Sequence, residues 1–336
     1  MLNILKELCT LNATSGDEGT VRKFIISKIQ GFCDYKVDAL GNIIAFKKGA
    51  KAGECKVMLD AHMDEVGLII TSVTADGYLK FATVGGINTE NLLFRKVKIN
   101  HNLFGIISGK PIHLLSADER KKLPKAESLY IDIGASSKEE VLSLVNLGDR
   151  AVICGDFSKN GDLICSKALD DRIGCAILIS LLRESSEYDF YATFTVQEEI
   201  GTRGAKTAAF SVNPDFALVL EGTTASDIAD VPDEKAVCNL GKGAAVSFMD
   251  LSAMYDKELY NAALNSGVLC QTKRAVAGGN NSGSIQQTGD GARTLAISVP
   301  CRYIHSASSV ASVTDIESAL ALTKYMLKGI SSGKIK

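Results

Sequence analysis

The stretch Val57-Met58-Leu59-Asp60-Ala61-His62 decides how this chain is interpreted, because a short apolar run ends at a residue that can bind a metal ion. Short continuous apolar runs are typical of strands buried on both faces of an open parallel sheet. In such sheets, ligands gather beyond the carboxyl ends of the strands. We therefore expect a two-metal hydrolase site at one sheet edge. Three further apolar runs lead to metal-binding side chains: Phe190 to Val196 before Glu198-Glu199, Phe216 to Leu220 before Glu221, and Thr294 to Val299 before His305.

An aspartate pair, Asp170-Asp171, enters a stretch rich in isoleucine and leucine. Two adjacent carboxylates repel each other, and neither is easily buried unless a cation compensates its charge. Two metal ions bridged by Asp170 would provide that compensation. The alternative is a helix start, where the aspartates face the positive end of the helix dipole and Arg172 pairs with Asp171. The residues alone leave both interpretations open.

A second acidic pair, Glu198-Glu199, follows an apolar run, where solvated carboxylates are out of place. Successive side chains of an extended strand point in opposite directions, so Glu199 can bind a metal while Glu198 faces the substrate. Zinc lowers the pKa of its bound water to about 7, so a nearby carboxylate can take the proton at neutral pH. Glu198 is therefore the predicted general base, which passes this proton to the leaving group.

The histidines complete the predicted site. A ligating imidazole usually donates its second ring N–H to a carboxylate or a carbonyl, and Asp64 is placed to orient His62 in this way. The alternative for His62 is a hydrogen-bonded histidine at a strand end. Three protein ligands per ion leave room for water, as catalytic sites require. The two predicted sites share Asp170 and comprise His62 with Glu221, and Glu199 with His305.

Composition excludes several classes of function. A net charge of −2 over 336 residues gives no excess of basic residues of the kind that binds nucleic acid or an anionic membrane. No apolar run approaches the length of a membrane span, and the first residues read as an amphipathic helix rather than a signal peptide, so we expect a cytoplasmic protein. The nine cysteines are scattered and without close pairs, so we expect them to be reduced and mostly buried.

The pattern of the chain divides it into two units. Between residues 67 and 157, short strands are broken by glycine and asparagine, which is typical of an all-β unit. Helices and strands alternate elsewhere, which favours an α/β fold with a mixed, mostly parallel sheet flanked by helices. We predict a catalytic domain of residues 1–66 and 158–336, split by an inserted β-rich domain of residues 67–157. His101 and His113 of the insertion are expected to be solvated or structural.

One local signal concerns the entrance to the second helix. Ser15 is followed three residues later by Glu18, and this spacing predicts a capping box, in which each side chain satisfies a backbone N–H of the first helical turn.

Four ordered motifs resemble those of the M42 metallo-aminopeptidases, a family that includes glutamyl, leucyl and deblocking aminopeptidases and the tetrahedral (TET) peptidases. The resemblance spans nearly the whole chain. The motifs are Ala61-His62-Met63-Asp64-Glu65-Val66-Gly67, Ala168-Leu169-Asp170-Asp171-Arg172, Gln197-Glu198-Glu199-Ile200-Gly201 and Arg302-Tyr303-Ile304-His305-Ser306.

The resemblance implies a zinc-peptidase-like α/β domain with an inserted small β-barrel, PDZ-like dimerisation domain. It implies two divalent metal ions per subunit, zinc or cobalt first and manganese as a further option, and stepwise removal of N-terminal residues from peptides. It also implies a homo-oligomer in which dimers assemble into a dodecamer, and a cis peptide between Asp170 and Asp171. By similarity, Glu198 is the general base, Asp64 orients His62, and the metal ligands are His62, Asp170, Glu199, Glu221 and His305.

Two departures from the family pattern matter. Many members have aspartate where this chain has Glu221, so we expect continued ligation with a changed spacing or metal preference. Many members have Gly-Gly-Thr-Asp where this chain has Gly278-Gly279-Asn280-Asn281. Loss of that carboxylate is expected to alter how the substrate is held.

Two other functions compete with the aminopeptidase. Paired carboxylates can cleave sugars, as in an endoglucanase-type glycosidase. The chain has no tryptophan and 6% aromatic residues, however, which leaves few surfaces on which a glucan could stack. A catalytically silent family member is the other alternative. The sequence leaves open the preferred N-terminal residue, the physiological metal and the subunit number.

Overall fold

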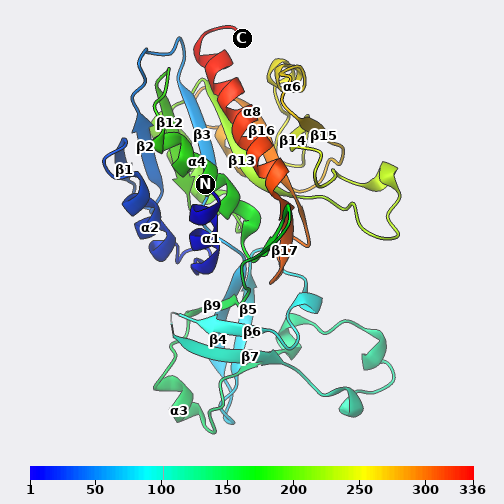
Figure 1. Cartoon of the computed structure of the whole chain (residues 1–336). Coiled ribbons are helices and arrows are strands. Elements are labelled where there is room, and N and C mark those ends of the chain that lie inside the picture. The colour runs from blue at the N-terminus through cyan, green and yellow to red at the C-terminus, as the bar shows by residue number, and fades with distance from the viewer. Residues whose placement is uncertain (101) are drawn as a thin grey trace.

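Two units make up the chain in the computed structural model, which describes residues 1–100 and 102–336. Figure 1 shows a layered α/β unit that contains both termini, with a small barrel attached to one end of it. The prediction for His101 lies outside the described residues. His113 is exposed on the barrel unit, as expected.

The α/β unit is built from the first and last parts of the chain. Its helices are α1 (Leu2–Thr10), α2 (Gly19–Ile29), α4 (Leu169–Arg183), α5 (Arg203–Val212), α6 (Lys257–Leu264), α7 (Asn281–Gln286) and α8 (Val313–Ser331). Its strands are β1 (Asp34–Val37), β2 (Ile43–Lys47), β3 (Val57–His62), β10 (Ser158–Asn160), β11 (Leu163–Ser166), β12 (Phe190–Thr195), β13 (Phe216–Thr224), β14 (Ala244–Ser247), β15 (Cys270–Lys273), β16 (Arg293–Arg302) and β17 (Ser309–Ser312).

These strands form one mixed sheet of eleven strands, in the order β1-β2-β12-β3-β13-β16-β17-β11-β10, with β14 paired to β16 and β15 paired to β14. The α/β prediction is confirmed. Strands β12, β3, β13 and β16 pair in parallel. The pairings that flank them, β2 with β12 and β16 with β17, are antiparallel. The mostly parallel character predicted from the sequence therefore holds for the centre of the sheet and for the pair of β14 with β15. The pairs β1–β2, β11–β17 and β10–β11 are antiparallel.

The central strands are apolar because helices cover both faces of the sheet. All six residues of β3 are buried. Leu59 and Leu218 point to the face covered by α1, α2, α4 and α8, whereas Met58 and Val219 point to the face covered by α5 and α7. A strand enclosed on both faces needs apolar side chains in both directions, and this produces the continuous runs seen in the sequence.

The inserted unit is a closed barrel with the strand order β4-β5-β8-β7-β6-β9. It has its own apolar core, which includes Leu68, Leu79, Val97 and Ile131. The predicted β-barrel insertion is therefore confirmed, while the limits 66/67 and 157/158 stay a prediction. Its elements are β4 (Gly67–Val73), β5 (Leu79–Val84), β6 (Lys96–Ile99), β7 (Leu103–Ser108), β8 (Tyr130–Asp132), α3 (Lys138–Leu142) and β9 (Arg150–Ile153).

The predicted capping box at the second helix is wrong. Helix α2 begins at Gly19, after Glu18, and no side chain caps it. The Ser15 hydroxyl instead donates to Asp64 Oδ2 at 2.6 Å, and Glu18 accepts from the backbone N–H groups of Gly16 and Gln197. The serine is drawn to a carboxylate of the sheet edge, a partner that local sequence spacing does not reveal.

Among the helices that the structure describes, none combines the length and the apolar character needed to cross a membrane.

Candidate metal centre

The sheet register brings the predicted ligands to one edge. His62, the last residue of β3, is paired in register with Thr195, so Glu198 and Glu199 follow just beyond it. Val219 is paired with Asp60, which places Glu221 level with His62, two residues further along each strand. Side chains two residues apart on a strand share a face, so His62 and Glu221 point the same way.

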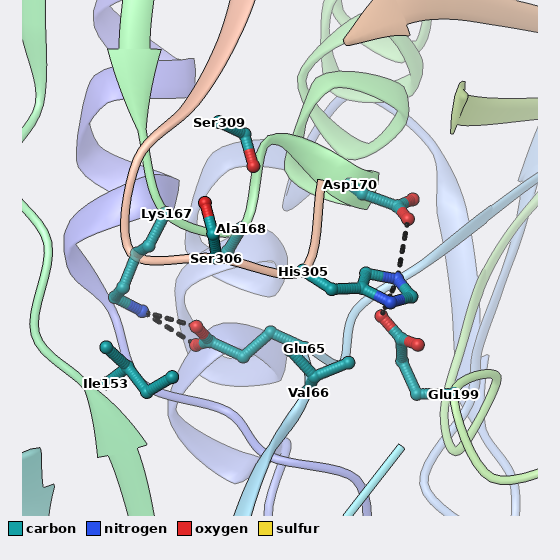
Figure 2. A pocket seen from close by; sticks show the side chains of 10 residues that line it. All are labelled: Glu65, Val66, Ile153, Lys167, Ala168, Asp170, Glu199, His305, Ser306 and Ser309. Atoms are coloured by element: carbon teal, nitrogen blue, oxygen red, sulfur yellow. Dashed lines mark hydrogen bonds and ion pairs between the residues drawn. The ribbon is translucent and has the colours of Figure 1, made fainter. Parts of the chain in front are cut away.

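Asp170 lies between the two imidazoles. Its Oδ1 is 3.3 Å from Nε2 of His62, and its Oδ2 is 3.4 Å from Nε2 of His305. Glu221 Oε2 lies 3.6 Å from the His62 nitrogen, and Glu199 Oε1 lies 3.3 Å from the His305 nitrogen. Figure 2 shows the His305 ring between Asp170 and Glu199. The five predicted ligands thus form two groups of three that share Asp170.

These separations suit metal ligands better than hydrogen-bond partners. N–H···O bonds usually measure 2.7 to 3.2 Å. Ligands held about 2.0 to 2.2 Å from a tetrahedral ion lie roughly 3.4 Å apart. Glu199 Oε1 and Glu221 Oε1 are also buried without a hydrogen-bond partner. Buried, unpaired carboxylate oxygens beside imidazole nitrogens are the donors that a divalent cation would satisfy, so the residues fit the metal ions implied by the sequence.

Asp171 is a neighbour of this cluster with a different set of partners. One of its oxygens lies within 4.8 Å of donor atoms of His62 and Glu221. Its Oδ1 accepts from the Gly174 N–H and its Oδ2 from the His62 N–H, so hydrogen bonds already occupy both. Of the two aspartates, Asp170 is therefore the better candidate for the shared position. The peptide bond between the two aspartates is cis, as the family resemblance implied.

The alternative interpretation of this aspartate pair is partly right. Asp171 does accept a backbone N–H in the first turn of α4. Arg172, however, does not pair with Asp171. Its guanidinium donates to the Leu8 carbonyl at 2.7 Å and to Glu65 Oε1 at 3.1 Å.

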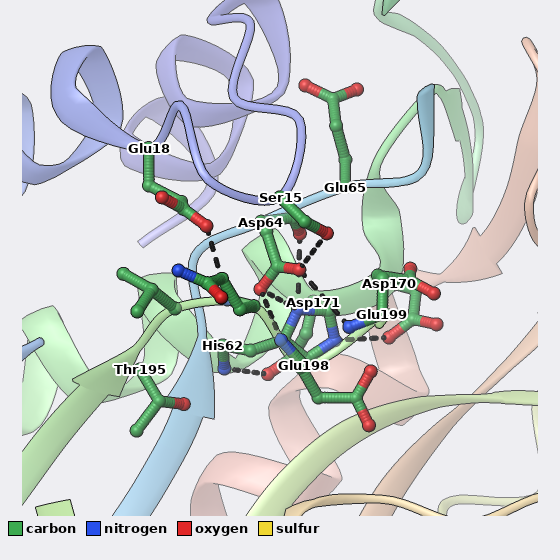
Figure 3. Close-up of polar contacts among 12 residues, drawn as sticks. Ser15, Glu18, His62, Asp64, Glu65, Asp170, Asp171, Thr195, Glu198 and Glu199 are labelled. Carbon is green, nitrogen blue, oxygen red and sulfur yellow. Dashed lines mark hydrogen bonds and ion pairs between the residues drawn. The ribbon is translucent and has the colours of Figure 1, made fainter. Parts of the chain in front are cut away.

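Asp64 connects several parts of the site (Figure 3). Its carboxylate accepts the backbone N–H of Glu198 at 3.0 Å and of Glu199 at 3.1 Å, in addition to the Ser15 hydroxyl. Nδ1 of His62 lies 3.1 Å from the Asp64 carbonyl oxygen and 3.5 Å from its Oδ1. Burial alone would raise the pKa of Asp64, but the hydrogen bonds from His62, Ser15 and the Glu198 backbone lower it. An ionised Asp64 therefore fixes both His62 and the acidic pair.

The barrel unit also contributes to the site. Nδ1 of His305 lies 2.8 Å from the carbonyl oxygen of Gly86, in the loop after β5. With Nδ1 held by that carbonyl, the other ring nitrogen, Nε2, faces Asp170 and Glu199. Sequence reasoning missed the contacts of Ser15 with Asp64 and of Gly86 with His305. The spacing of Ser15 and Glu18 favours a helix cap instead, and a backbone carbonyl carries no signal in the sequence.

The electrostatics of the cluster favour an added positive charge. Burial, together with the neighbouring Glu199 and Asp170, raises the pKa of Glu198 to about 8. Burial also raises the pKa of Glu221 well above its usual value. Burial would lower the pKa of His305, yet the Asp170 and Glu199 carboxylates raise it to about 11. Besides burial, neighbouring carboxylates contribute to all three shifts, and divalent cations would offset this excess of buried negative charge.

Unusual backbone surrounds the ligands. Ala168, Gln197, Tyr303 and His305 all have left-handed φ values, between 53° and 58°. Such conformations cost non-glycine residues of order 1 to 3 kcal/mol each and cluster at functional sites. Gly222 is required for a different reason, since a Cβ there would lie 2.9 Å from the Asp170 Cβ.

A second charged cluster lies beside the first (Figure 2). Lys167 Nζ donates to both oxygens of Glu65 at 2.7 Å, and Arg172 adds a further bond. All three side chains are buried. A cavity of about 20 Å³ is lined by residues of both clusters, among them Glu65 and Asp170.

A larger cavity of about 590 Å³ opens onto the predicted ligands. Asp170, Glu198, Glu221 and His305 line one part of it. The loop that carries Gly278, Gly279 and Asn280 lines another part, and so does Lys273 of β15. A cavity of this size accommodates small ligands or the end of a peptide.

Asn281 does not contribute to this cavity. It is fully buried, and its amide donates to Asp60 Oδ2 at 2.7 Å and to the Thr195 hydroxyl at 2.8 Å. The expectation that residue 281 alters how the substrate is held is therefore wrong for direct contact. The physical reason is that the side chain points back into the packing between α7 and the sheet.

An α/β sheet whose carboxyl edge gathers imidazoles and carboxylates around a cavity is typical of metal-dependent peptide hydrolases. The comparison with protein families makes the class specific. The chain belongs to the M42 glutamyl aminopeptidase family, whose model matches residues 41–322. Peptidases of this family are metal-dependent, and the chain is accordingly a peptide hydrolase of the aminopeptidase type.

Individual relatives agree with this assignment. The chain is 30% identical over 344 residues to the lysyl aminopeptidase of Pyrococcus furiosus, covering 97% of this chain and 96% of that one. A TET aminopeptidase from Thaumarchaeota archaeon SCGC AB-539-E09 superposes with a TM-score of 0.94 at 33% identity, covering 99% and 97%. The TET1 peptidase of Pyrococcus horikoshii, which can assemble into a tetrahedron or a large octahedral shell, gives a TM-score of 0.84 at 34% identity, covering 97% and 98%.

Proposed function

We propose that this protein is an aminopeptidase that uses two divalent metal ions to hydrolyse the first peptide bond of its substrates. The observation that carries the proposal is the position of Asp170, whose two oxygens each face a different imidazole at 3.3 and 3.4 Å. His62 and Glu221 would hold one ion with Asp170, and Glu199 and His305 would hold the other. Zinc and cobalt suit this mixture of imidazole and carboxylate, with manganese as a further option.

When bound, such ions lower the pKa of water and polarise a carbonyl group. The chain's own residues perform the proton transfer. A carboxylate oxygen of Glu198 takes a proton from the attacking water and gives it to the nitrogen of the leaving amine. Asp64 supports this role because it holds the Glu198 backbone N–H at 3.0 Å and fixes the start of the acidic loop.

The negative charge of the cluster also suits a substrate with a free N-terminus. The protonated α-amine is attracted to carboxylates that line the cavity, such as Glu198 and Glu199. The names of similar proteins differ in the residue removed, since the family is named for glutamyl and the Pyrococcus furiosus relative for lysyl aminopeptidases. Those names leave the preferred residue of this chain open.

A homo-oligomer is part of the proposal. The Pyrococcus horikoshii TET1 peptidase can assemble into a tetrahedron or a large octahedral shell, and this chain resembles it over nearly its whole length. We propose the same kind of assembly, with dimers joined through the barrel unit of residues 67–157 and built up to a dodecamer. Light scattering of the purified protein tests the subunit number.

The decisive experiment for the activity is a panel of aminoacyl-p-nitroanilides, assayed with zinc, cobalt and manganese after metal removal. We expect metal-dependent release of nitroaniline and two ions per chain by elemental analysis. A chain that binds fewer than one ion after repletion and hydrolyses no substrate would be the catalytically silent member. Hydrolysis of a cellulose derivative that resists chelators would instead support the glycosidase.

A further inference from the structure

Four consecutive backbone N–H groups, those of residues 196–199, all donate to side-chain oxygens. Strand β12 ends at Thr195, so these groups lie beyond the pairing of the sheet. The acceptor is Asn42 Oδ1 for Val196 at 2.9 Å, Glu18 Oε1 for Gln197 at 3.1 Å, and the Asp64 carboxylate for Glu198 and Glu199 at 3.0 and 3.1 Å. The three side chains that accept, Asn42, Glu18 and Asp64, are at most 3% exposed. The acidic pair therefore sits on a backbone that buried side chains hold at every N–H group.

We infer that Glu18 is a positioning residue for the reaction. By holding the Gln197 N–H group, its carboxylate sets the path of the backbone that presents Glu198 to the cavity. Glu18 is not among the described residues that line the 590 Å³ cavity, so it acts through the loop and not on the substrate. The inference rests on the proposed function, in which Glu198 transfers the proton.

The backbone at Gln197 needs such a contact. Its φ of 57° lies in the left-handed region, which a non-glycine residue keeps only when its surroundings hold it there. The carbonyl side of the loop is held locally, because Val196 O and Gln197 O accept from Gly204 and Arg203 in the first turn of α5. The N–H side depends instead on side chains from distant parts of the chain. Glu18 is 179 positions away from Gln197.

One short loop reaches both acceptors of the acidic pair. Ser15 and Glu18 come from the segment between α1 and α2 (Figure 3). The Ser15 hydroxyl donates to Asp64, and Glu18 contacts Gln197. This loop therefore fixes Asp64 and Gln197 relative to each other. A misplacement of about 1 Å in a reacting group can lower a rate on the order of 10²-fold, so a contact at this point can influence turnover.

A purely local role for Glu18 is the competing explanation. Its Oε1 also accepts the Gly16 N–H at 2.7 Å, within its own loop. A carboxylate that stabilised only this turn would affect unfolding and leave the catalytic steps unchanged. The experiment must therefore compare kcat with KM, metal content and the order of the acidic loop.

The test compares the zinc-loaded wild type with Glu18→Met and Glu18→Gln on an aminoacyl-p-nitroanilide. Methionine is of similar length, but its sulfur is a weak acceptor. In Glu18→Met, kcat should fall about 10- to 100-fold, with KM and the zinc content unchanged. Glutamine keeps a carbonyl oxygen that can accept both N–H groups, so Glu18→Gln should retain most of the turnover.

Hydrogen exchange gives a readout that does not depend on turnover. In the wild type, the N–H groups of residues 196–199 should be protected, as measured by mass spectrometry of peptides that span them. In Glu18→Met they should exchange about 10-fold faster or more, because one hydrogen bond of the loop is lost. Glu18→Gln should exchange at nearly the wild-type rate.

Asp315→Leu is the matched control. Asp315 is also a buried carboxylate that accepts two backbone N–H groups, those of Gly241 and Gly243, at 2.7 Å each. It is not among the described residues that line either cavity at the proposed centre. Its substitution should lower the thermal midpoint, as Glu18→Met should, without changing kcat or the exchange of residues 196–199.

The possible outcomes are distinct. Wild-type kcat in Glu18→Met, or equal losses in Glu18→Met and Glu18→Gln, would overturn the inference and leave the aminopeptidase intact. Loss of zinc from Glu18→Met would also overturn it, because the carboxylate would then support the ligand Glu199 and not the base. A wild type that hydrolyses no substrate, with faster exchange still caused by Glu18→Met, would overturn the proposed function and support the contact of Glu18 with the loop.

A second variant covers a failure of Glu18→Met to fold, which thermal unfolding would reveal. Glu18→Asp keeps the negative charge but is one methylene shorter, so it withdraws the acceptor from the Gln197 N–H. We expect the same loss of kcat and the same faster exchange. Wild-type values of both in Glu18→Asp would overturn the inference.

Discussion

Two clusters of buried charge face each other across a cavity of about 20 Å³, and their difference identifies the functional one. In the first, Glu65 accepts from Lys167, Arg172 and the Ala13 backbone, so the chain itself supplies every counter-charge. In the second, Glu199 Oε1 and Glu221 Oε1 are buried without a hydrogen-bond partner, and the nearest base to Glu199 Oε1 is the His305 ring at 3.3 Å. The first cluster is neutralised by the chain itself, whereas the second is the one at which we propose that cations bind.

The largest expected effect is a loss of turnover, and it distinguishes Glu198 from the proposed metal ligands of the second cluster. Glu198→Gln should lower kcat by about 10²- to 10⁴-fold, because the amide cannot take a proton from water. Metal content should stay at the wild-type value, since the proposed ligands are unchanged. Steady-state hydrolysis of an aminoacyl-p-nitroanilide, together with elemental analysis, checks both. Near-normal turnover by this variant would refute the assigned role.

A change in the first cluster should act on stability and not on metal binding. Glu65→Gln leaves Lys167 and Arg172 buried without a counter-charge, so the free energy of unfolding should fall by about 3 to 5 kcal/mol. Urea denaturation measures this change. Glu187→Gln is the matched control, because Glu187 forms exposed ion pairs with Lys51 and Lys328 and should cost less than about 1 kcal/mol. Equal effects of the two changes would contradict the comparison.

Metal removal should destabilise the protein through the second cluster. A ligand at 100 times its dissociation constant stabilises the folded state by about 2.7 kcal/mol. Chelation should therefore lower the thermal midpoint, and added zinc should restore it. Asp170→Asn should abolish this response to zinc, because both proposed ions lose their shared ligand. Asp118→Asn, at an exposed site on the barrel unit, should respond as the wild type does.

Asp60 offers an intermediate case, since it is a buried carboxylate whose partners are neutral. Burial raises its pKa to about 6 despite hydrogen bonds from Thr193 and Asn281. A folded-state pKa above the unfolded value means that Asp60 lowers stability as the pH rises from about 4 to 6. Asn281→Asp should extend this loss to higher pH, because two adjacent buried carboxylates must share a proton.

The expected cost of Asn281→Asp at neutral pH is about 1 to 3 kcal/mol, which should shrink on acidification. Urea midpoints at several pH values measure it. Asn265→Asp provides the comparison, because Asn265 is exposed at the end of α6. A variant equally stable at all pH values would show that position 281 tolerates either residue without a shared proton.

The sequence predicted those features that local patterns encode. The run ending at His62 is apolar because both faces of β3 are covered. A run of this kind predicts both that a strand is present and where it ends. Four of the five proposed ligands follow apolar runs of this kind, so they could be named before any coordinates, whereas Asp170 lies at the start of α4. The antiparallel pairing of β16 with β17 could not be predicted in the same way, because strand direction depends on the path of the connecting loop.

Other contacts depend on segments far apart in the chain. Ser15 meets Asp64 across 49 positions, and Gly86 meets His305 across 219. A single serine or glycine has many ordinary roles, so its type alone carries no information about these partners.

The Gly86 carbonyl has a consequence for engineering. This carbonyl belongs to the insertion and contacts the His305 ring. An α/β unit without the insertion would therefore lack one of the contacts that orient this proposed ligand. Chimaeras that exchange this segment between homologues would need to reproduce an acceptor at the same point in space. Shortening the connection after β5 would be expected to tilt the imidazole even if each half of the hybrid folded correctly.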